Sequence, residues 1–258
     1  AGARMGITGK ALMLAMAASL ALGGTDSVRA AEITVLASQG GFTGARDLGA
    51  AFEKSTGHKV TVITAQSATM NRKIDNDEPA DVVSQFLDTF EDLVTRGKVV
   101  TGTYAEYARV GNGVAVKAGA PKPDISTPEA FKRAMLDAKS ISHSNNGTGP
   151  FNTRLFQRLG IYEQIKDKIV VSGGGPVAAD VAAGKVEIGI QQTNVIQPFP
   201  GTDYVGPLPP ELMEYGVMGI GLLSVSKQRD VALAFIKFAT SPEAGPILRP
   251  SAMEPSPQ

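Results

Sequence analysis

The sequence contains no cysteine and no tryptophan, and only two of its 258 residues are histidines. Without cysteine, a disulfide framework, cysteine-ligated zinc, an iron–sulfur cluster and a thiol nucleophile are all excluded. The histidines, His58 and His143, do not form the HExxH pair found in zinc hydrolases. The acidic residues Asp75, Asp77 and Glu78 fall at a predicted helix end, which favours a solvated turn over a metal site. We therefore expect no metal, no cofactor and no Ser-His-Asp triad.

An excess of charge of one sign is also missing, because 25 Lys and Arg residues balance 25 Asp and Glu residues. Binding to nucleic acid depends on clustered basic side chains, so we expect no nucleic-acid partner. The phosphate-binding motifs GxxxxGK[ST] and GxGxxG and the nucleophile motif GxSxG do not occur either. The chain does have 43% hydrophobic and 19% charged residues, a composition that predicts a packed core.

The N-terminal segment has the pattern of a signal peptide. Arg4 and Lys10 precede an apolar run, Ala11–Leu22, which is shorter than the ~20 residues that span a membrane. Small residues in Val28-Arg29-Ala30 fit a cleavage site after residue 30. We expect residues 1–30 to be removed and the mature protein to be soluble in the periplasm. The alternative is an uncleaved N-terminal anchor.

Beyond residue 30, short apolar runs typical of strands alternate with segments of helical spacing. The predicted strands are Ile33–Leu36, Val60–Ile63, Pro79–Val83, Ser140–Ser142, Ile169–Val171 and Val186–Ile190. Helical spacing of Ala45, Leu48 and Phe52, closed by Gly57, indicates one intervening helix. The capping box Ser126-Thr127-Pro128-Glu129 predicts the start of another. This alternation is typical of parallel sheets with helices on their faces.

Two glycine-bearing strands, Arg109–Val116 and Tyr215–Ser224, are expected to cross between two such units. The sequence therefore predicts an α/β clamshell with two lobes, each a mainly parallel sheet flanked by helices. Residues 31–112 and 217–258 would form lobe I, and residues 113–216 would form lobe II.

Ligands of open α/β sheets bind beyond the carboxyl ends of the strands. The loops expected there are Ala37–Phe42, Gln66–Thr69, His143–Gly149, Ser172–Val177 and Gln191–Asn194. Most of them open a helix, where unpaired N–H groups and the helix dipole favour an anion. The alternative for any one loop is ordinary turn chemistry. Arg109, at the predicted crossing, could bind a carboxylate or form a structural ion pair.

Several segments resemble periplasmic substrate-binding proteins of the molybdate-binding type, the type II clamshell of ABC importers. They are AFEKSTGHKV, ATMNRKIDNDEPADVV, VAVKAGAPKPDISTPEAFKRAML, VAAGKVEIGIQQ, GPLPPEL and ALAFIKFATSPEAGPIL. The resemblance covers the whole mature chain and keeps the order of the segments. It implies export, a small ligand between the lobes, and a permease and an ATPase as partners.

In molybdate binders, two hydroxyls, backbone amides and a tyrosine hold a tetrahedral oxyanion. Ser67 matches the hydroxyl of the second loop, whereas the first-loop hydroxyl falls near Gly40, with Ser38 as a substitute. The tyrosine position carries Gln191 or Gln192. Because amides both donate and accept hydrogen bonds, this departure favours a ligand with carbonyl, carboxylate or hydroxyl groups.

The sequence thus predicts a monomeric solute-binding protein that captures a small anion, molybdate-like or a carboxylate, without turnover. The predicted ligand-binding residues are Ser38, Gly40, Gly41, Gln66, Ser67, Arg109, Asn146, Gly147, Thr148, Pro176, Val177, Gln191 and Gln192. The alternative is a periplasmic isomerase on the same scaffold, similar to enzymes that interconvert cis- and trans-aconitate. Proton transfer would then need a base, for which His143 is the candidate.

Overall fold

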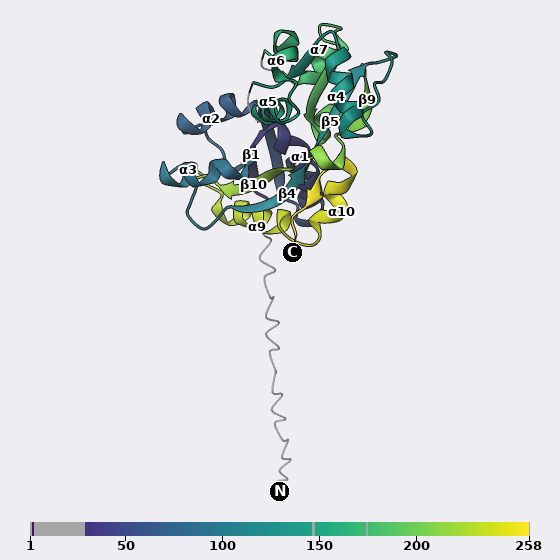
Figure 1. The fold of residues 1–258 in the computed structure, drawn as a ribbon. Coiled ribbons are helices and arrows are strands. Elements are labelled where there is room, and N and C mark those ends of the chain that lie inside the picture. Colours follow the sequence, from purple (N-terminus) through teal and green to yellow (C-terminus); the bar gives the residue numbers. More distant parts are fainter. Residues whose placement is uncertain (1, 3–28, 146–147, 174, 258) are drawn as a thin grey trace.

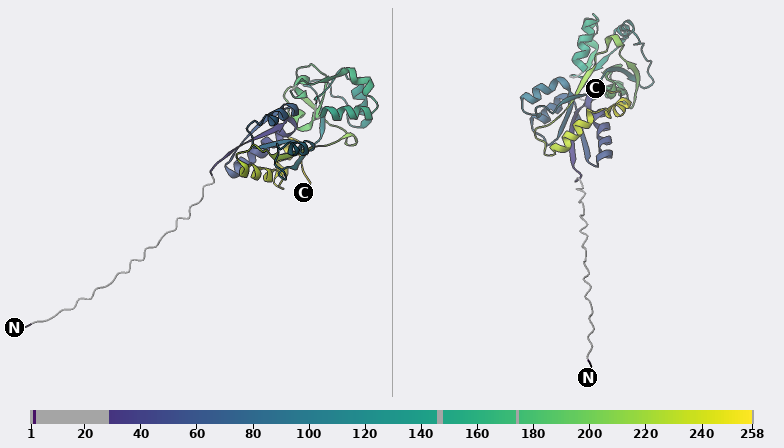
Figure 2. Two further views of the ribbon diagram at one scale, coloured as in Figure 1. Left: turned by 90° about the vertical axis from the view of Figure 1, so that its left-hand side faces the viewer. Right: turned by 90° about the horizontal axis from the view of Figure 1, so that it is seen from below.

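A computed structural model describes residues 2, 29–145, 148–173 and 175–257. The predicted signal peptide falls almost wholly outside these ranges, as do Asn146 and Gly147. The described chain forms two lobes, each around its own sheet (Figures 1 and 2). No helix within the described ranges combines the length and apolar character needed to cross a membrane.

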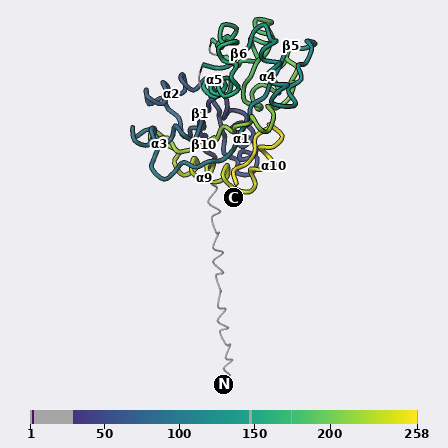
Figure 3. Tube along the Cα trace, in the orientation of Figure 1, coloured from purple at the N-terminus to yellow at the C-terminus, as the bar shows by residue number. Residues whose placement is uncertain are grey.

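Lobe I is built on a six-stranded sheet with the order β11-β4-β10-β3-β1-β2. Its strands are β1 (Glu32–Ser38), β2 (Lys59–Ala65), β3 (Val82–Phe86), β4 (Ala105–Val110), β10 (Gly216–Leu222) and β11 (Glu254–Pro255). Helices α1 (Gln39–Thr56), α9 (Arg229–Ala239) and α10 (Ala244–Leu248) bury apolar side chains on one face of the sheet. Helices α2 (Ser67–Asp75) and α3 (Phe90–Thr95) cover the other face. The C-terminal helices thus pack beside the N-terminal helix α1 (Figure 3).

Lobe II is built on a five-stranded sheet with the order β7-β6-β8-β5-β9. Its strands are β5 (Asn112–Lys117), β6 (Ile141–His143), β7 (Ile169–Val171), β8 (Ile188–Gln192) and β9 (Thr202–Pro207). Helices α4 (Pro128–Asp137), α5 (Thr148–Arg158) and α6 (Tyr162–Ile165) form the larger apolar core on one face. Helices α7 (Val177–Ala182) and α8 (Thr193–Ile196) cover the other face. Single 3-10 turns follow β3, α6, β9 and α10.

The predicted two-lobed α/β architecture is confirmed, with one difference in the sheets. Both are mixed rather than mainly parallel, because β10 runs antiparallel to β3 and β4, and β5 runs antiparallel to β8 and β9. The expected single strand Arg109–Val116 is two strands, β4 and β5, in different sheets. The chain changes sheet at Gly111, where a Cβ atom would lie 2.9 Å from the Met213 sulfur.

Helix α1 begins at Gln39, so the expected loop Ala37–Phe42 is the end of β1 and the first helical turn. Glycine disfavours a helix by about 1 kcal/mol relative to alanine, which is why the sequence predicts a loop here. Contacts with distant segments explain the glycines. A Cβ atom on Gly40 would lie 2.1 Å from Gln192 Oε1, and one on Gly41 would lie 2.5 Å from Ser84 Oγ.

Two predicted helix ends are confirmed by their geometry. Thr127 is the N-cap of α4, where its hydroxyl accepts a 3.1 Å hydrogen bond from the Ala130 N–H, and Pro128 is the first helical residue. Gly57 ends α1 in the left-handed region, with φ of 76°, and its N–H donates to Glu53. These local signals fix where the helices start and stop relative to the strands that they cover.

Candidate functional site

Two adjoining cavities lie between the two lobes and share four lining residues. The larger, called the outer cavity here, has a volume of about 610 Å³, and the smaller, called the inner cavity, has about 20 Å³. Both are lined by Ser67, Phe86, Thr148 and Gln192. The inner cavity is further lined by Gln39, Gly40, Gln66, Ser144 and Gln191. The outer cavity is further lined by Ala68, Asn71, Asp88, Thr89, Asn112, Pro150, Phe151, Arg154, Glu214, Tyr215, Gly216 and Val217.

The inner cavity lies where strands of both sheets end and helices begin. Gly40 belongs to the first turn of α1, Ser67 opens α2 and Thr148 opens α5. Gln191 and Gln192 end β8 and, like Thr148, reach the cavity from lobe II, whereas Gly40 and Ser67 belong to lobe I. Six of the predicted site residues are therefore brought together: Gly40, Gln66, Ser67, Thr148, Gln191 and Gln192.

The inner cavity has a polar but uncharged lining. None of its described lining residues carries an ionised side chain, and the first turns of α1, α2 and α5 reach it. Backbone N–H groups at helix N-termini lack partners within the helix, and the helix dipole is positive there. Neutral donors and helix N-termini are the groups with which proteins bind small anions without a metal.

Hydrogen bonds tie the two lobes together around the inner cavity. Gln66 Nε2 donates to the Gly175 carbonyl at 3.2 Å, and Gln191 Nε2 donates to Gln39 Oε1 at 3.2 Å. Asn194 Nδ2 donates to the Gly40 carbonyl at 2.8 Å. All three bonds join residues more than a hundred positions apart. They hold the cavity walls in register.

Four further predicted ligand residues, Ser38, Gly41, Pro176 and Val177, are absent from the lining of the inner cavity but adjoin residues that line it. Ser38 is 1% exposed, and its hydroxyl has no hydrogen-bond partner within the described part of the chain. The Val177 N–H, which follows Pro176, donates to Gln191 Oε1 at 3.0 Å. The Gly41 carbonyl accepts a hydrogen bond from a buried tyrosine. These residues shape the wall and position Gln191.

That tyrosine, Tyr107, supports the first turn of α1. Its hydroxyl donates to the Gly41 carbonyl at 3.3 Å and lies 2.8 Å from Ser84 Oγ. Burial raises the pKa of Tyr107 to about 12, although the hydrogen bond to Ser84 lowers it in part. The phenol is therefore neutral at physiological pH and remains a donor.

Arg109 and His143 also line neither cavity. Arg109 on β4 donates from Nε to Glu106 Oε1 at 2.7 Å, which is the ion-pair alternative considered above. This bond raises the pKa of Arg109, so its charge is held on the surface of lobe I. His143 is 6% exposed, and its Nδ1–H donates to the Ser144 carbonyl at 2.8 Å.

Sequence reasoning missed several residues that line the outer cavity. Asn112 is the first residue of β5, and its Oδ1 has no partner among the described residues. Phe86, a residue type more common in cores, lines both cavities. Arg154 on α5 lies with Nη2 3.9 Å from Glu214 Oε1. A single exposed arginine on a polar helix face gives no local signal, so only its place in the fold identifies it.

The acidic residues near the end of α2 form ion pairs with lysine and arginine side chains. Lys98 pairs with Asp77 at 2.8 Å, Lys73 pairs with Glu78 at 2.8 Å, and Asp75 bonds to an arginine. Within the described ranges, no three His, Asp or Glu side chains are placed to hold a metal ion. The pairing fits a solvated turn.

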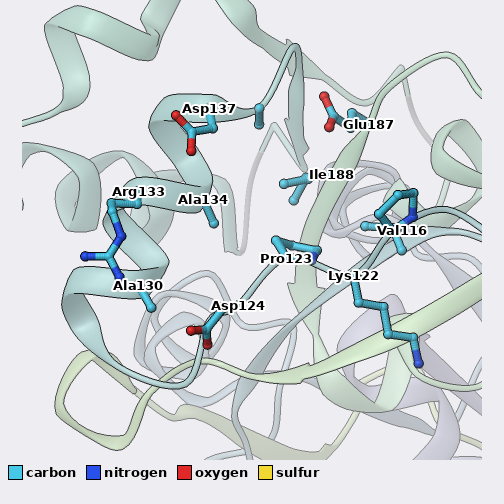
Figure 4. A pocket seen from close by; sticks show the side chains of 12 residues that line it. Val116, Lys122, Pro123, Asp124, Ala130, Arg133, Ala134, Asp137, Glu187 and Ile188 are labelled. Atoms are coloured by element: carbon cyan, nitrogen blue, oxygen red, sulfur yellow. The ribbon is translucent and has the colours of Figure 1, made fainter.

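A separate cavity of about 340 Å³ lies on the surface of lobe II, between α4 and the sheet. Figure 4 shows Asp124, Asp137 and Glu187 spread around its rim on different segments, away from one another. Asp124 already accepts hydrogen bonds from Ser126, and Glu187 accepts one from the Lys139 N–H. The polar groups of this cavity do not converge, so the pair of cavities between the lobes is the stronger candidate.

Comparisons with known proteins agree with this geometry. Residues 33–253 match the family model of bacterial extracellular solute-binding proteins. An aconitate isomerase from Pseudomonas sp. is 32% identical over 249 residues, which are 93% of this chain and 95% of that enzyme. A molybdate-binding protein ModA from Rhodobacter capsulatus is 27% identical over 253 residues, which are 95% of this chain and 94% of that protein.

Solved structures share the fold. The periplasmic molybdate-binding protein of Azotobacter vinelandii superposes with a TM-score of 0.73 at 21% identity, over 88% of this chain and 100% of that one. The sulfate-binding protein SubI from Mycobacterium tuberculosis gives a TM-score of 0.69 at 17% identity, over 87% of each chain. At these identities the likeness establishes the two-lobed architecture and leaves the ligand to be inferred from the cavities.

Proposed function

The chain belongs to the family of bacterial extracellular solute-binding proteins, and we propose that it captures a small organic carboxylate between its lobes. The family membership agrees with the resemblance found in the sequence. In this proposal the loaded protein delivers its ligand to the permease and ATPase of an ABC importer. It is exported with residues 1–30 as signal peptide. Its lobes are divided within one residue of the boundaries predicted above, with Asn112 opening β5 of lobe II and Gly216 opening β10 of lobe I.

The size and lining of the two cavities carry the proposal. A volume of about 610 Å³ lies within the range of about 300–1,000 Å³ typical of small-molecule sites. It leaves room for a carbon skeleton beside the apolar rings of Phe86, Phe151 and Tyr215. Ser67, Thr148 and Gln192, which line both cavities, offer hydroxyl, amide and helix N-terminal donors to a carboxylate at the end of this skeleton.

Gln192 argues for a carboxylate over a compact oxyanion. Its carboxamide packs against Gly40 and lines the inner cavity, which is left with a volume of about 20 Å³. A glutamine side chain both donates and accepts, and so suits a ligand with mixed hydrogen-bonding groups. The sequence relative with the higher identity is the aconitate isomerase, at 32% against 27% for the molybdate binder.

Ligand-induced stabilisation tests the proposal. A ligand at a hundredfold excess over its Kd stabilises the folded protein by about 2.7 kcal/mol. We expect citrate or trans-aconitate to raise the melting temperature of the purified protein, with molybdate, tungstate, sulfate and uncharged sugars as the comparison set. Stabilisation by sugars alone would refute anion binding. Stabilisation by molybdate and tungstate alone would refute the carboxylate.

A second candidate is an isomerase of a small tricarboxylate, favoured by the aconitate isomerase relative. The reaction moves a proton across an allylic system and requires a base at the ligand. His143, the base expected from the sequence, lies behind Ser144 rather than in the lining, whereas the carboxylates of Asp88 and Glu214 line the outer cavity.

Turnover distinguishes the two candidates. We expect purified protein incubated with trans-aconitate to produce no cis isomer, because binding alone needs no titrating group. Sustained conversion would replace the transport proposal with the isomerase. Comparing His143→Ala with Asp88→Asn and Glu214→Gln would then identify the base.

A further inference from the structure

Helix α5 contributes several residues to the lining of the outer cavity. Thr148, Phe151 and Arg154 all lie on α5 and all contact this cavity. Thr148 also lines the inner cavity, where its hydroxyl lies 3.0 Å from Ser144 Oγ. Arg154 follows six residues later, a rise of about 9 Å along the helix axis.

We propose that Arg154 binds a second carboxylate of the ligand, so that the site selects extended polycarboxylates over anions with a single charged centre. This inference rests on the proposed function, since it assumes that the first carboxylate binds Ser67, Thr148 and Gln192, which line both cavities. Phe151 lies between the two polar ends on the same helix, and Phe86 lines both cavities. Along α5 the lining thus changes from polar to apolar to cationic. This order is complementary to a ligand with a carbon skeleton and a carboxylate at each end.

The charges at the mouth of the cavity support this assignment. Among the described lining residues of both cavities, Arg154 is the sole Lys or Arg. Its partner Glu214 lies 3.9 Å away, and both side chains are more than half exposed. Such exposed pairs contribute only about 0–1 kcal/mol, so a ligand carboxylate can take the place of Glu214. A carboxylate can bind the guanidinium through two parallel hydrogen bonds, which makes arginine selective for this group.

Two acidic side chains at the same mouth sharpen the selection. Asp88 and Glu214 both line the outer cavity and repel any anion there, so that a ligand carboxylate is favoured in it only beside Arg154. A ligand with only one charged centre, held by Ser67, Thr148 and Gln192, gains nothing from the arginine. An extended ligand reaches the cation and offsets the repulsion. Arg154 is therefore a specificity-determining residue.

Isothermal titration of three proteins tests this role: the wild type, Arg154→Gln and Arg158→Gln. Arg158 lies on the same helix, is exposed and lines neither cavity, so its substitution removes an equal charge as a matched control. The probes are citrate, trans-aconitate, acetate and molybdate. We expect Arg154→Gln to weaken citrate and trans-aconitate binding by about 10- to 100-fold, the loss typical of a charge-assisted hydrogen bond. Arg158→Gln should change it by less than about twofold.

The outcomes separate this inference from the proposed function. If the wild type binds citrate or trans-aconitate and Arg154→Gln binds them equally well, the inference fails while carboxylate binding stands. If the wild type binds molybdate or acetate more tightly than the extended probes, the selection for polycarboxylates is wrong. If no anion binds the wild type, the proposed function fails and the inference falls with it. Partial recovery in Arg154→Lys would further support a role for the charge.

Discussion

Substitution of Gly149 by alanine should destabilise the protein, because the wall of the inner cavity leaves no space for a methyl group there. A Cβ atom on Gly149 would lie 1.8 Å from the Ser144 carbonyl oxygen and 3.1 Å from His143 Nδ1. The first of these atoms belongs to the backbone, so no rotamer change relieves the clash. The Ser144 backbone or the first turn of α5 has to move.

The magnitude follows from what that movement breaks. Overpacking in a well-packed region costs about 1–3 kcal/mol. Displacing the Ser144 carbonyl also weakens the bond that it accepts from His143, a loss of about 1 kcal/mol. Alanine recovers up to about 1 kcal/mol of helix propensity at this position in α5. We expect a net loss of about 2 kcal/mol in the free energy of unfolding.

Thermal denaturation of Gly149→Ala and Gly173→Ala measures this difference. A loss of 2 kcal/mol lowers the melting temperature of a chain of this size by about 4–8 °C. Gly173 has no atom within 4 Å of the position that a Cβ would take, so its substitution should shift stability by less than about 0.5 kcal/mol. A Gly149→Ala protein that melts with the wild type would refute the close approach on which this reasoning depends.

Three further outcomes are expected. Tyr107→Phe should lower the free energy of unfolding by about 1–2 kcal/mol in a urea titration, because the buried Ser84 hydroxyl and Gly41 carbonyl lose a partner; an unchanged midpoint would contradict that network. The pKa values of Tyr107 and Tyr204 are raised to about 12 by burial, so the unfolded chain releases these protons at lower pH than the folded one. Their contribution to stability is therefore complete below about pH 10 and is lost as the pH rises to about 12, which unfolding at a series of alkaline pH values will show and Tyr204→Phe should reduce. Thr127→Ala should cost about 1 kcal/mol of stability by removing the N-cap of α4, and an equal melting temperature would show that the cap contributes nothing.

Several features of the fold could be predicted from the sequence because their signals are local. Apolar runs bounded by small residues mark β1, β2, β6 and β7, and the Thr127 cap and Gly57 mark helix ends. Strand β9 has no such local signal, because its residues are partly exposed and do not form an apolar run. Its pairing with β5 in the structure identifies it as a strand. The order of strands in the sheets has no local signal either, and the mixed pairing appears only when β10 inserts between β3 and β4.

The candidate site divides in the same way. Small polar residues after strands identified Ser67, Thr148 and the Gln191–Gln192 pair from the sequence, because helix N-termini and strand ends carry recognisable residue types. Such local signals do not show which arginine lines a cavity. The sequence suggested Arg109 and gave no indication of Arg154, whereas the packing shows that Arg109 pairs with Glu106 on β4 and that Arg154 lines the outer cavity.

The sequence by itself determined the alternation of strands and helices and the polar character of the turns, because each depends on residues within a few positions of one another. The tertiary structure decided where α1 begins and which side chains meet across the cavity. Position 40 requires a glycine because Gln192 occupies the space where a Cβ atom would lie, and the Gly40 carbonyl accepts a hydrogen bond from Asn194, 154 positions away. Contacts between such distant residues follow from how the two sheets fold onto each other, and no local pattern encodes them.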